Sequence, residues 1–262
     1  MLLNTKILTV SIIGSGNVAG ALGNAFLKNG IIVSEIYSLN PQNSKLLASK
    51  LGCSYVKTMD ELNADSDLYI IAIPDKEIAS VSSLLARVNG IVVHTSGSVP
   101  ISVLSDCAFG FGVFYPLQTF TMDSKAEFND IPICIEGVNN DVTNSLKQLA
   151  EKISNNVVVL NSEQRRYLHL TAVTVNNFTN WLYGMAHGML LEKDIDFSLL
   201  HPLINETASK ISSIHPATAQ TGPARRNDIS TINDHLELLR NYPDYKKLYT
   251  LISDQIIKKY HD

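Results

Sequence analysis

Residues 11–30, "SIIGSGNVAGALGNAFLKNG", join a short apolar run to a glycine-rich turn and a helix-forming stretch. Gly14, Gly16 and Ala19 match the pattern G-x-G-x-x-G/A, directly after an expected strand and at the start of an expected helix. The first glycine permits the turn, the second lets a pyrophosphate approach the backbone, and the alanine lets helix and strand pack closely. A purely structural turn could use the same residues, so the surrounding chain has to separate these two interpretations.

The chain around this turn alternates strand patterns with helix patterns up to residue 160. Strands are expected over residues 6–14, 32–39, 54–56, 67–75, 90–97, 112–117, 131–137 and 155–160. Helices are expected over residues 17–30, 41–52, 76–88 and 141–154. Repeated strand–helix units predict an α/β fold with a doubly wound, mostly parallel sheet. The glycine turn lies in the first of these units, which favours dinucleotide binding over a structural role.

The strand signals stop after residue 160. One long helical stretch is expected over residues 162–193, and further helices over 197–214, 229–241 and 245–259. The sequence therefore predicts a Rossmann-like dinucleotide-binding domain over residues 1–160 and an all-α substrate or dimerisation domain over residues 161–262.

Composition excludes several classes of protein. The 262 residues carry a net charge of -4 and no long run of Lys or Arg, so nucleic acid is not an expected partner. Three widely spaced cysteines suggest neither a disulfide framework nor a zinc site, and no metal is expected. The first residues lack a signal-peptide pattern, and no segment approaches the ~20 apolar residues of a membrane span, so a cytoplasmic protein is expected.

The end of the second strand bears on which dinucleotide binds. An NAD site usually has an acidic residue there, about 20 residues after the glycines. Here the tip reads Ser38-Leu39-Asn40, and Ser38 and Asn40 could donate hydrogen bonds to a 2′-phosphate. The tip therefore favours NADP over NAD, although the nearest cation is Lys45 and no Arg is present.

Other polar groups follow the remaining strands, at the sheet edge where open α/β sheets bind ligands. The fourth, fifth and sixth strands run into Asp75, His94 and Gln118 respectively. The residues expected to contact the cofactor are Gly14, Ser15, Gly16, Asn17, Val18, Ser38, Asn40, Ala72, Ile73, Pro74, Thr95 and Ser96, and Gln118 is expected to contact the substrate.

Six motifs resemble, in order and spacing, one bacterial family. They are "IIGSGNVAGALG" (12–23), "IIAIPD" (70–75), "VVHTSGSVP" (92–100), "GVFYPLQTFT" (112–121), "SEQRRYLHLTAVTVNNFTN" (162–180) and "TAQTGPARRND" (218–228). The family is grouped as NADP oxidoreductases and joins a Rossmann-like domain to a helical domain of the DUF2520 type. Its superfamily includes pyrroline-5-carboxylate reductase and 6-phosphogluconate dehydrogenase.

The resemblance implies a nicotinamide-binding protein whose helical domain closes the cleft and forms a homodimer. It supplies no substrate. Related chains often carry Ser-Arg at the tip of the second strand, and Leu39 stands where that Arg would be.

Hydride transfer requires positioning and a proton donor or acceptor from the protein. Related dehydrogenases take a Lys and an Asn from the first long helix of the second domain, but residues 163–187 contain no Lys. His169 is the best substitute because imidazole exchanges protons near neutral pH. In a regular α-helix, at about 100° per residue, His169, Asn176, Asn180 and His187 lie within roughly 20° of one line. A solvated or dimer-facing edge would show the same stripe.

The second member of the catalytic pair is open between two neighbours. Helical geometry favours Asn176, whereas the resemblance singles out Asn177. We take His169 and Asn177 as the catalytic candidates, and Asn180 as a substrate contact. Arg225 could bind a carboxylate or phosphate on the substrate, or pair with Asp228 across a dimer interface.

These observations predict an NADP-dependent oxidoreductase that reduces a small carbonyl or imine substrate, with the active site between the two domains. The alternative is a non-catalytic dinucleotide-binding sensor or scaffold. The absence of a Lys from residues 163–187 and of an Arg from the tip of the second strand favours this alternative.

Overall fold

The computed structural model describes residues 6–107, 109–121 and 127–261. The chain divides into two compact units, a sheet unit (Met1–Val175) and a helical unit (Asn176–Asp262). The sheet unit thus extends past residue 160, the boundary expected from the sequence, because the first helix after the last strand is bound to the sheet.

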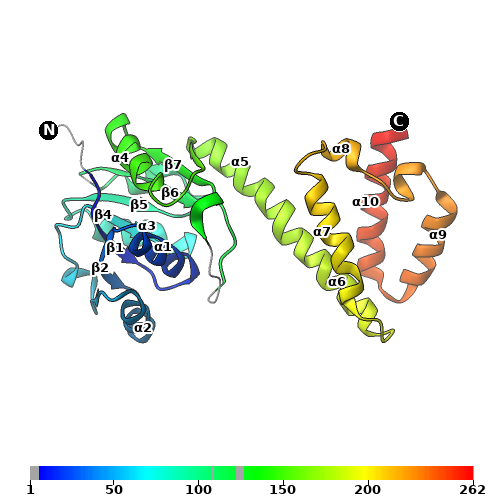
Figure 1. Cartoon of the computed structure of the whole chain (residues 1–262), viewed down its shortest axis with the longest axis horizontal. Helices are drawn as coiled ribbons and strands as arrows, with labels where there is room; N and C mark the ends of the chain where they lie inside the picture. Colours follow the sequence, from blue (N-terminus) through cyan, green and yellow to red (C-terminus); the bar gives the residue numbers. More distant parts are fainter. Residues whose placement is uncertain (1–5, 108, 122–126, 262) are drawn as a thin grey trace. The chain divides into compact units, whose positions relative to one another are not determined.

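The sheet unit is built on eight strands, all of which the sequence predicts (Figure 1). They are β1 (Thr9–Ile13), β2 (Ile32–Tyr37), β3 (Ser54–Tyr55), β4 (Leu68–Ile71), β5 (Ile91–His94), β6 (Phe111–Pro116), β7 (Ile133–Gly137) and β8 (Val157–Val159). Their spatial order is β3-β2-β1-β4-β5-β6-β7-β8, and every neighbouring pair is parallel except the antiparallel pair β6 and β7. The expected doubly wound, mostly parallel sheet is confirmed.

Helices cover both faces of this sheet. They are α1 (Asn17–Lys28), α2 (Pro41–Leu51), α3 (Ile78–Leu84) and α4 (Asn140–Ala150), and after the last strand the chain continues into α5 (Ser162–Ala172). Buried side chains of α1, α2 and α4, such as Phe26, Leu47 and Leu146, form one core with the sheet. Ile78 of α3 belongs to a second core that contains Tyr69 and Leu104. Strands covered on both faces explain the continuous apolar runs in the sequence.

The long helical stretch is not a regular α-helix. A π-helical segment (Val173–Phe178) separates α5 from α6 (Thr179–Leu191). Hydrogen bonds in a π-helix join residues five apart, so each residue turns through less than the angle of an α-helix. The single line expected from His169 to His187 assumed α-helical geometry throughout. That expectation is wrong, because the π-helical segment shifts the phase between His169 and the residues after it.

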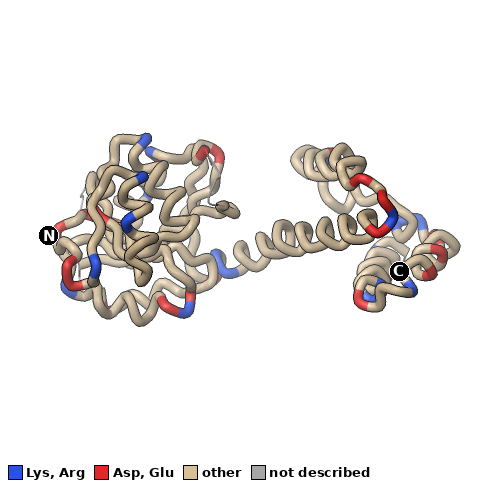
Figure 2. The backbone as a smooth tube through the Cα atoms, turned by 90° about the horizontal axis from the view of Figure 1, so that it is seen from below, with Lys and Arg blue, Asp and Glu red and all other residues tan. Residues whose placement is uncertain are grey.

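The helical unit continues with α7 (His201–Lys210), α8 (Pro216–Ala219), α9 (Ile229–Leu238) and α10 (Pro243–His261). Short 3₁₀ helices in the chain span Met59–Glu61, Asp75–Glu77, Ile101–Leu104, Phe128–Asp130, Phe197–Leu200, Ala224–Arg226 and Leu239–Asn241. Basic and acidic residues are interspersed along the chain rather than gathered in a basic track (Figure 2). Within the described residues, no helix has the length and apolar character needed to cross a membrane.

Candidate functional site

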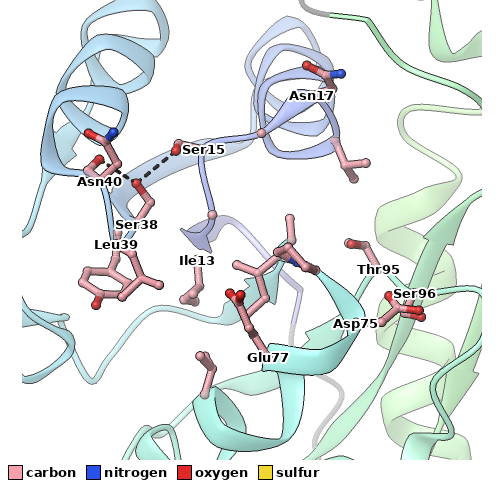
Figure 3. Close-up of a pocket in the computed structure, with 18 of the residues that line it drawn as sticks. Ile13, Ser15, Asn17, Ser38, Leu39, Asn40, Asp75, Glu77, Thr95 and Ser96 are labelled. Carbon is pink, nitrogen blue, oxygen red and sulfur yellow. Dashed lines mark hydrogen bonds between the residues drawn. The ribbon is translucent and has the colours of Figure 1, made fainter.

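A cavity of about 820 Å³ lies at the carboxyl ends of the central strands. Its walls come from the β1–α1 turn, the tip of β2, the ends of β4 and β5, and the segment after β6 (Figure 3). All twelve residues predicted to contact a cofactor line this cavity, and so does Gln118. The volume falls within the usual range of small-molecule sites. The sequence thus located the cavity because carboxyl ends of parallel strands share one edge of a sheet.

The glycine turn gives the cavity an anion-binding wall. Gly14 has a φ of +125°, and a Cβ atom built on it would lie 2.1 Å from the Ala72 carbonyl oxygen. Gly16 precedes α1, and a Cβ atom there would meet no described heavy atom within 4 Å. Gly16 is the N-cap of α1, and no described side-chain hydrogen bond caps the start of this helix. The first amide N–H groups of this helix therefore remain available to a phosphate, as in dinucleotide-binding turns.

The tip of β2 is held by its own hydrogen bonds. The Ser15 hydroxyl donates to Ser38 Oγ at 3.0 Å (Figure 3). Ser38 Oγ also bonds Ser44 Oγ at 2.7 Å. Asn40 Oδ1 accepts from the backbone N–H of Gln42 at 3.0 Å and so caps α2. Ser38 therefore orders the turn, while Leu39, whose exposed fraction is 80%, lines the cavity without a polar group.

The tip of β2, Ser38-Leu39-Asn40, carries no carboxylate either. Glu35, the acidic residue nearest to it on β2, is buried and accepts hydrogen bonds from the Ser11 hydroxyl and the Asn63 N–H. It therefore serves the packing of the sheet and not the ribose of a ligand.

The loop after β5 is held by internal hydrogen bonds. His94 is fully buried, and its Nδ1 accepts a hydrogen bond from the Ser96 N–H at 3.2 Å. Burial, together with the nearby Arg165 guanidinium, lowers the pKa of His94 to about 4, so the ring is neutral at neutral pH. Ser96 Oγ in turn accepts from the N–H groups of Ser98 and Val99. These bonds fix Thr95 and Ser96 at the cavity wall.

Beside this loop, α5 brings His169 against Tyr115 and Gly97. The Tyr115 hydroxyl and His169 Nδ1 are 3.0 Å apart, and the two rings meet edge to face. A Cβ atom on Gly97 would lie 2.6 Å from His169 Nδ1, so only glycine leaves room for the imidazole. His169 does not itself line the cavity. Ser96, which precedes Gly97, and Gln118, three residues after Tyr115, do line it.

An ion pair holds α5 to the sheet one turn before His169. Arg165 is fully buried and pairs with Glu136 on β7. Arg165 also donates to the Val99 carbonyl oxygen, and Glu136 accepts from the backbone and hydroxyl of Ser162. The motif at residues 162–180 drew attention to this helix, but no local pattern identified Arg165 or Tyr115, because both partners lie far away in the sequence.

The other predicted site residues belong to the helical unit. Asn177 and Asn180 are exposed, with Asn177 inside the π-helical segment. The Arg225 guanidinium lies 4.1 Å from the centre of the Tyr260 ring, and no described ion pair joins it to Asp228. Asp228 instead caps α9 through the Thr231 N–H, so the pairing considered from the sequence is not formed within one chain.

Metal ligands are not gathered anywhere in the described part of the chain, since no three His, Cys, Asp or Glu residues there could hold one ion. Cys53, Cys107 and Cys134 are free thiols. Burial raises the pKa of Cys107 and of Cys134 to about 11, which keeps both in the unreactive thiol form.

Two family models match the chain, a Rossmann-like domain over residues 2–117 and the domain of unknown function DUF2520 over residues 131–256. A crystal structure named "putative NADP oxidoreductase BF3122 from Bacteroides fragilis" is 35% identical, covers 98% of this chain and 99% of its own, and superposes with a TM-score of 0.90. The chain belongs to this DUF2520 family.

More distant structures share the fold of the DUF2520 protein. The pyrroline-5-carboxylate reductase of Streptococcus pyogenes is 14% identical, covers 97% of this chain and 100% of its own, and has a TM-score of 0.64. A reductive aminase from Aspergillus terreus, solved with NADPH and ethyl levulinate, is 14% identical over 97% of this chain and 96% of its own, with a TM-score of 0.72. No curated protein matches the sequence.

Proposed function

We propose that this DUF2520 protein is an NADP-dependent oxidoreductase that reduces a small carbonyl or imine compound. The observation that carries the proposal is the glycine turn inside the 820 Å³ cavity, with free space beside Gly16 and an uncapped helix behind it. The Bacteroides fragilis relative is named for NADP, and the reductive aminase of the same fold was solved with NADPH. A bound nicotinamide cofactor would supply the hydride.

The chain's own residues would bind, orient and exchange protons. The amide groups at the start of α1 would bind the pyrophosphate, and the Asn40 side chain, next to exposed Leu39, would lie near the adenosine ribose. His169 would donate the proton that the substrate oxygen or nitrogen gains as its carbon accepts hydride. We retain Asn177 as the second catalytic candidate on the resemblance alone, and Asn180 and Arg225 as candidate substrate contacts.

Calorimetric titration with NADPH and NADH at fixed salt tests the cofactor assignment. We expect micromolar binding of NADPH and weaker binding of NADH. Binding of neither would contradict the proposal, and NADPH binding without turnover of any carbonyl or imine tested would favour a sensor or scaffold.

Leu39 offers a sharper test of the 2′-phosphate position. We expect Leu39→Arg to raise NADPH affinity about ten-fold, because a guanidinium–phosphate hydrogen bond contributes about 1.5–3 kcal/mol. NADH affinity should stay within about two-fold, since NADH lacks the 2′-phosphate, and Leu39→Met should change neither. An equal gain in affinity for NADPH and NADH would show that the 2′-phosphate does not bind beside residue 39.

We further propose that the protein is a homodimer through its helical unit. No charged residue occurs between Tyr167 and Leu191, and large apolar side chains of α6 and its neighbours stand exposed. In the helical unit these are Phe178, Trp181, Leu182, Leu191, Ile195, Leu199, Leu203, Ile211, Ile214, Ile229, Leu238, Leu251 and Ile252. Exposed apolar area of this extent is typical of an interaction surface.

Sedimentation equilibrium should therefore give twice the 28.8 kDa mass of one chain. Trp181→Glu should shift the equilibrium toward the monomer, whereas Ile32→Glu, at an exposed position of the sheet unit, should leave it unchanged. A monomer at micromolar wild-type concentration would contradict the proposal.

A further inference from the structure

Tyr115 and His169 form a hydrogen-bonded pair between a strand and a helix. Tyr115 lies near the end of β6, and His169 lies on α5, 54 residues later. Both side chains are half-buried, with 3.0 Å between the tyrosine hydroxyl and Nδ1 and ring centres 6.0 Å apart. Only one hydrogen can lie between these two atoms, so one of them is the donor and the other the acceptor. If the tyrosine donates, a neutral His169 carries its proton on Nε2, and if Nδ1 donates, the proton is on Nδ1.

The surroundings of Tyr115 indicate which of the two atoms is the donor. Burial raises the pKa of Tyr115 to about 12, with a smaller contribution from nearby Cys134, so the phenol keeps its proton at neutral pH. A half-buried hydroxyl needs an acceptor for that proton. His169 Nδ1 is the one acceptor found for it among the described residues. The hydroxyl therefore donates, and Nδ1 accepts.

We propose that Tyr115 is a positioning residue that fixes His169 in the tautomer with its proton on Nε2. The inference rests on the proposed function, in which His169 is the proton donor. A donor must present an N–H to the substrate, and with Nδ1 engaged by Tyr115 the nitrogen left for that task is Nε2.

The packing around the ring restricts its rotation as well. Gly97 lies against the imidazole, where a Cβ atom would be 2.6 Å from Nδ1 and 2.7 Å from Cγ. The loop that carries Gly97 is fixed by His94 and Ser96, and the Arg165–Glu136 ion pair fixes α5 one turn earlier. A ring flip would put Cδ2 in the place of Nδ1 and so break the hydrogen bond with the Tyr115 hydroxyl. The pair thus sets both the tautomer and the direction of the ring.

Nitrogen NMR of ¹⁵N-histidine-labelled protein tests the assignment without a substrate, because the two ring nitrogens have distinct shifts when protonated and unprotonated. Spectra are recorded at a pH high enough that the histidine shifts no longer change with pH. The His169→Gln variant, which lacks the His169 signals, assigns them. In the wild type we expect Nε2 of His169 to be fully protonated and Nδ1 unprotonated. In Tyr115→Phe the two shifts should move toward each other as the tautomers mix.

The chain provides a matched control. His235 Nδ1 and the Tyr249 hydroxyl form a second pair at 2.7 Å within the helical unit. Tyr249→Phe removes the same hydroxyl and should change the signals of His235 while leaving those of His169 unaltered. If Tyr115→Phe fails to fold, Gly97→Ala provides the second variant, because its methyl group should displace the ring and also mix the tautomers.

A proton on Nδ1 of His169 in the wild type, or unaltered His169 shifts in both variants, would overturn the proposal. NADPH titration of the same samples separates this failure from that of the proposed function. Tyr115→Phe should keep wild-type NADPH affinity, since the hydroxyl does not line the cavity. Absence of NADPH binding in the wild type would refute the cofactor assignment and leave the tautomer result unaffected.

Discussion

Gly14→Ala is expected to lower the free energy of unfolding by about 2–5 kcal/mol and to weaken NADPH binding more than ten-fold. A left-handed conformation costs a residue with a Cβ about 1–2 kcal/mol, and overpacking adds about 1–3 kcal/mol. Both terms apply, because φ is +125° and the new methyl carbon would lie 2.1 Å from the Ala72 carbonyl oxygen. Ala72 cannot retreat without breaking the hydrogen bond that its N–H donates to Ile13 across β1 and β4.

Gly16→Ala is the matched control, measured by the same urea denaturation and calorimetry. Gly16 has a φ of -83°, and no described atom lies within 4 Å of a Cβ there, so stability should change by less than about 1 kcal/mol. NADPH affinity should still fall about ten-fold, because the methyl group would occupy the space through which the pyrophosphate approaches. Wild-type affinity in Gly16→Ala would contradict the binding mode, and wild-type stability in Gly14→Ala would contradict the described turn.

Arg165→Ala is expected to lower the free energy of unfolding by about 3–5 kcal/mol, since it leaves the Glu136 carboxylate with no cation in a buried environment. The guanidinium is fully buried and also bonds the Val99 carbonyl oxygen, so two elements of the sheet unit lose a partner. Urea denaturation monitored by circular dichroism measures the loss.

A surface ion pair provides the comparison. Lys147 on α4 pairs at 3.7 Å with Glu151 at the end of the helix, both side chains are exposed, and such pairs contribute little. Lys147→Ala should therefore cost less than about 1 kcal/mol. A similar small cost for Arg165→Ala would show that the Glu136 carboxylate finds water or another donor once the guanidinium is removed.

The sheet and its cofactor wall could be predicted because their signals are local. Apolar runs such as residues 68–73 mark strands buried on both faces, and Gly14 and Gly16 mark the turn that follows one of them. Asn40 and Gly52 likewise mark the two ends of α2, as a side-chain cap and a left-handed terminus. Each of these signals lies within a few residues of the feature it predicts.

The pairs around His169 could not be predicted in this way. Tyr115 precedes His169 by 54 residues, and Gly97 precedes it by more. Arg165 on α5 pairs with Glu136 on β7, which is also distant in the sequence. Composition and periodicity do not encode which strand end faces α5. The π-helical segment also escaped prediction, because helical periodicity was extended across it as a regular α-helix.

That segment affects how relatives should be compared. A π-helical turn accommodates one more residue than an α-helical turn of similar rise, without opening the helix. A relative with a one-residue deletion among positions 173–178 could therefore keep an unbroken helix with the same faces on either side. Alignments of this family should place length differences inside the segment, because a gap moved to a neighbouring loop would pair residues that lie about 100° apart around the helix.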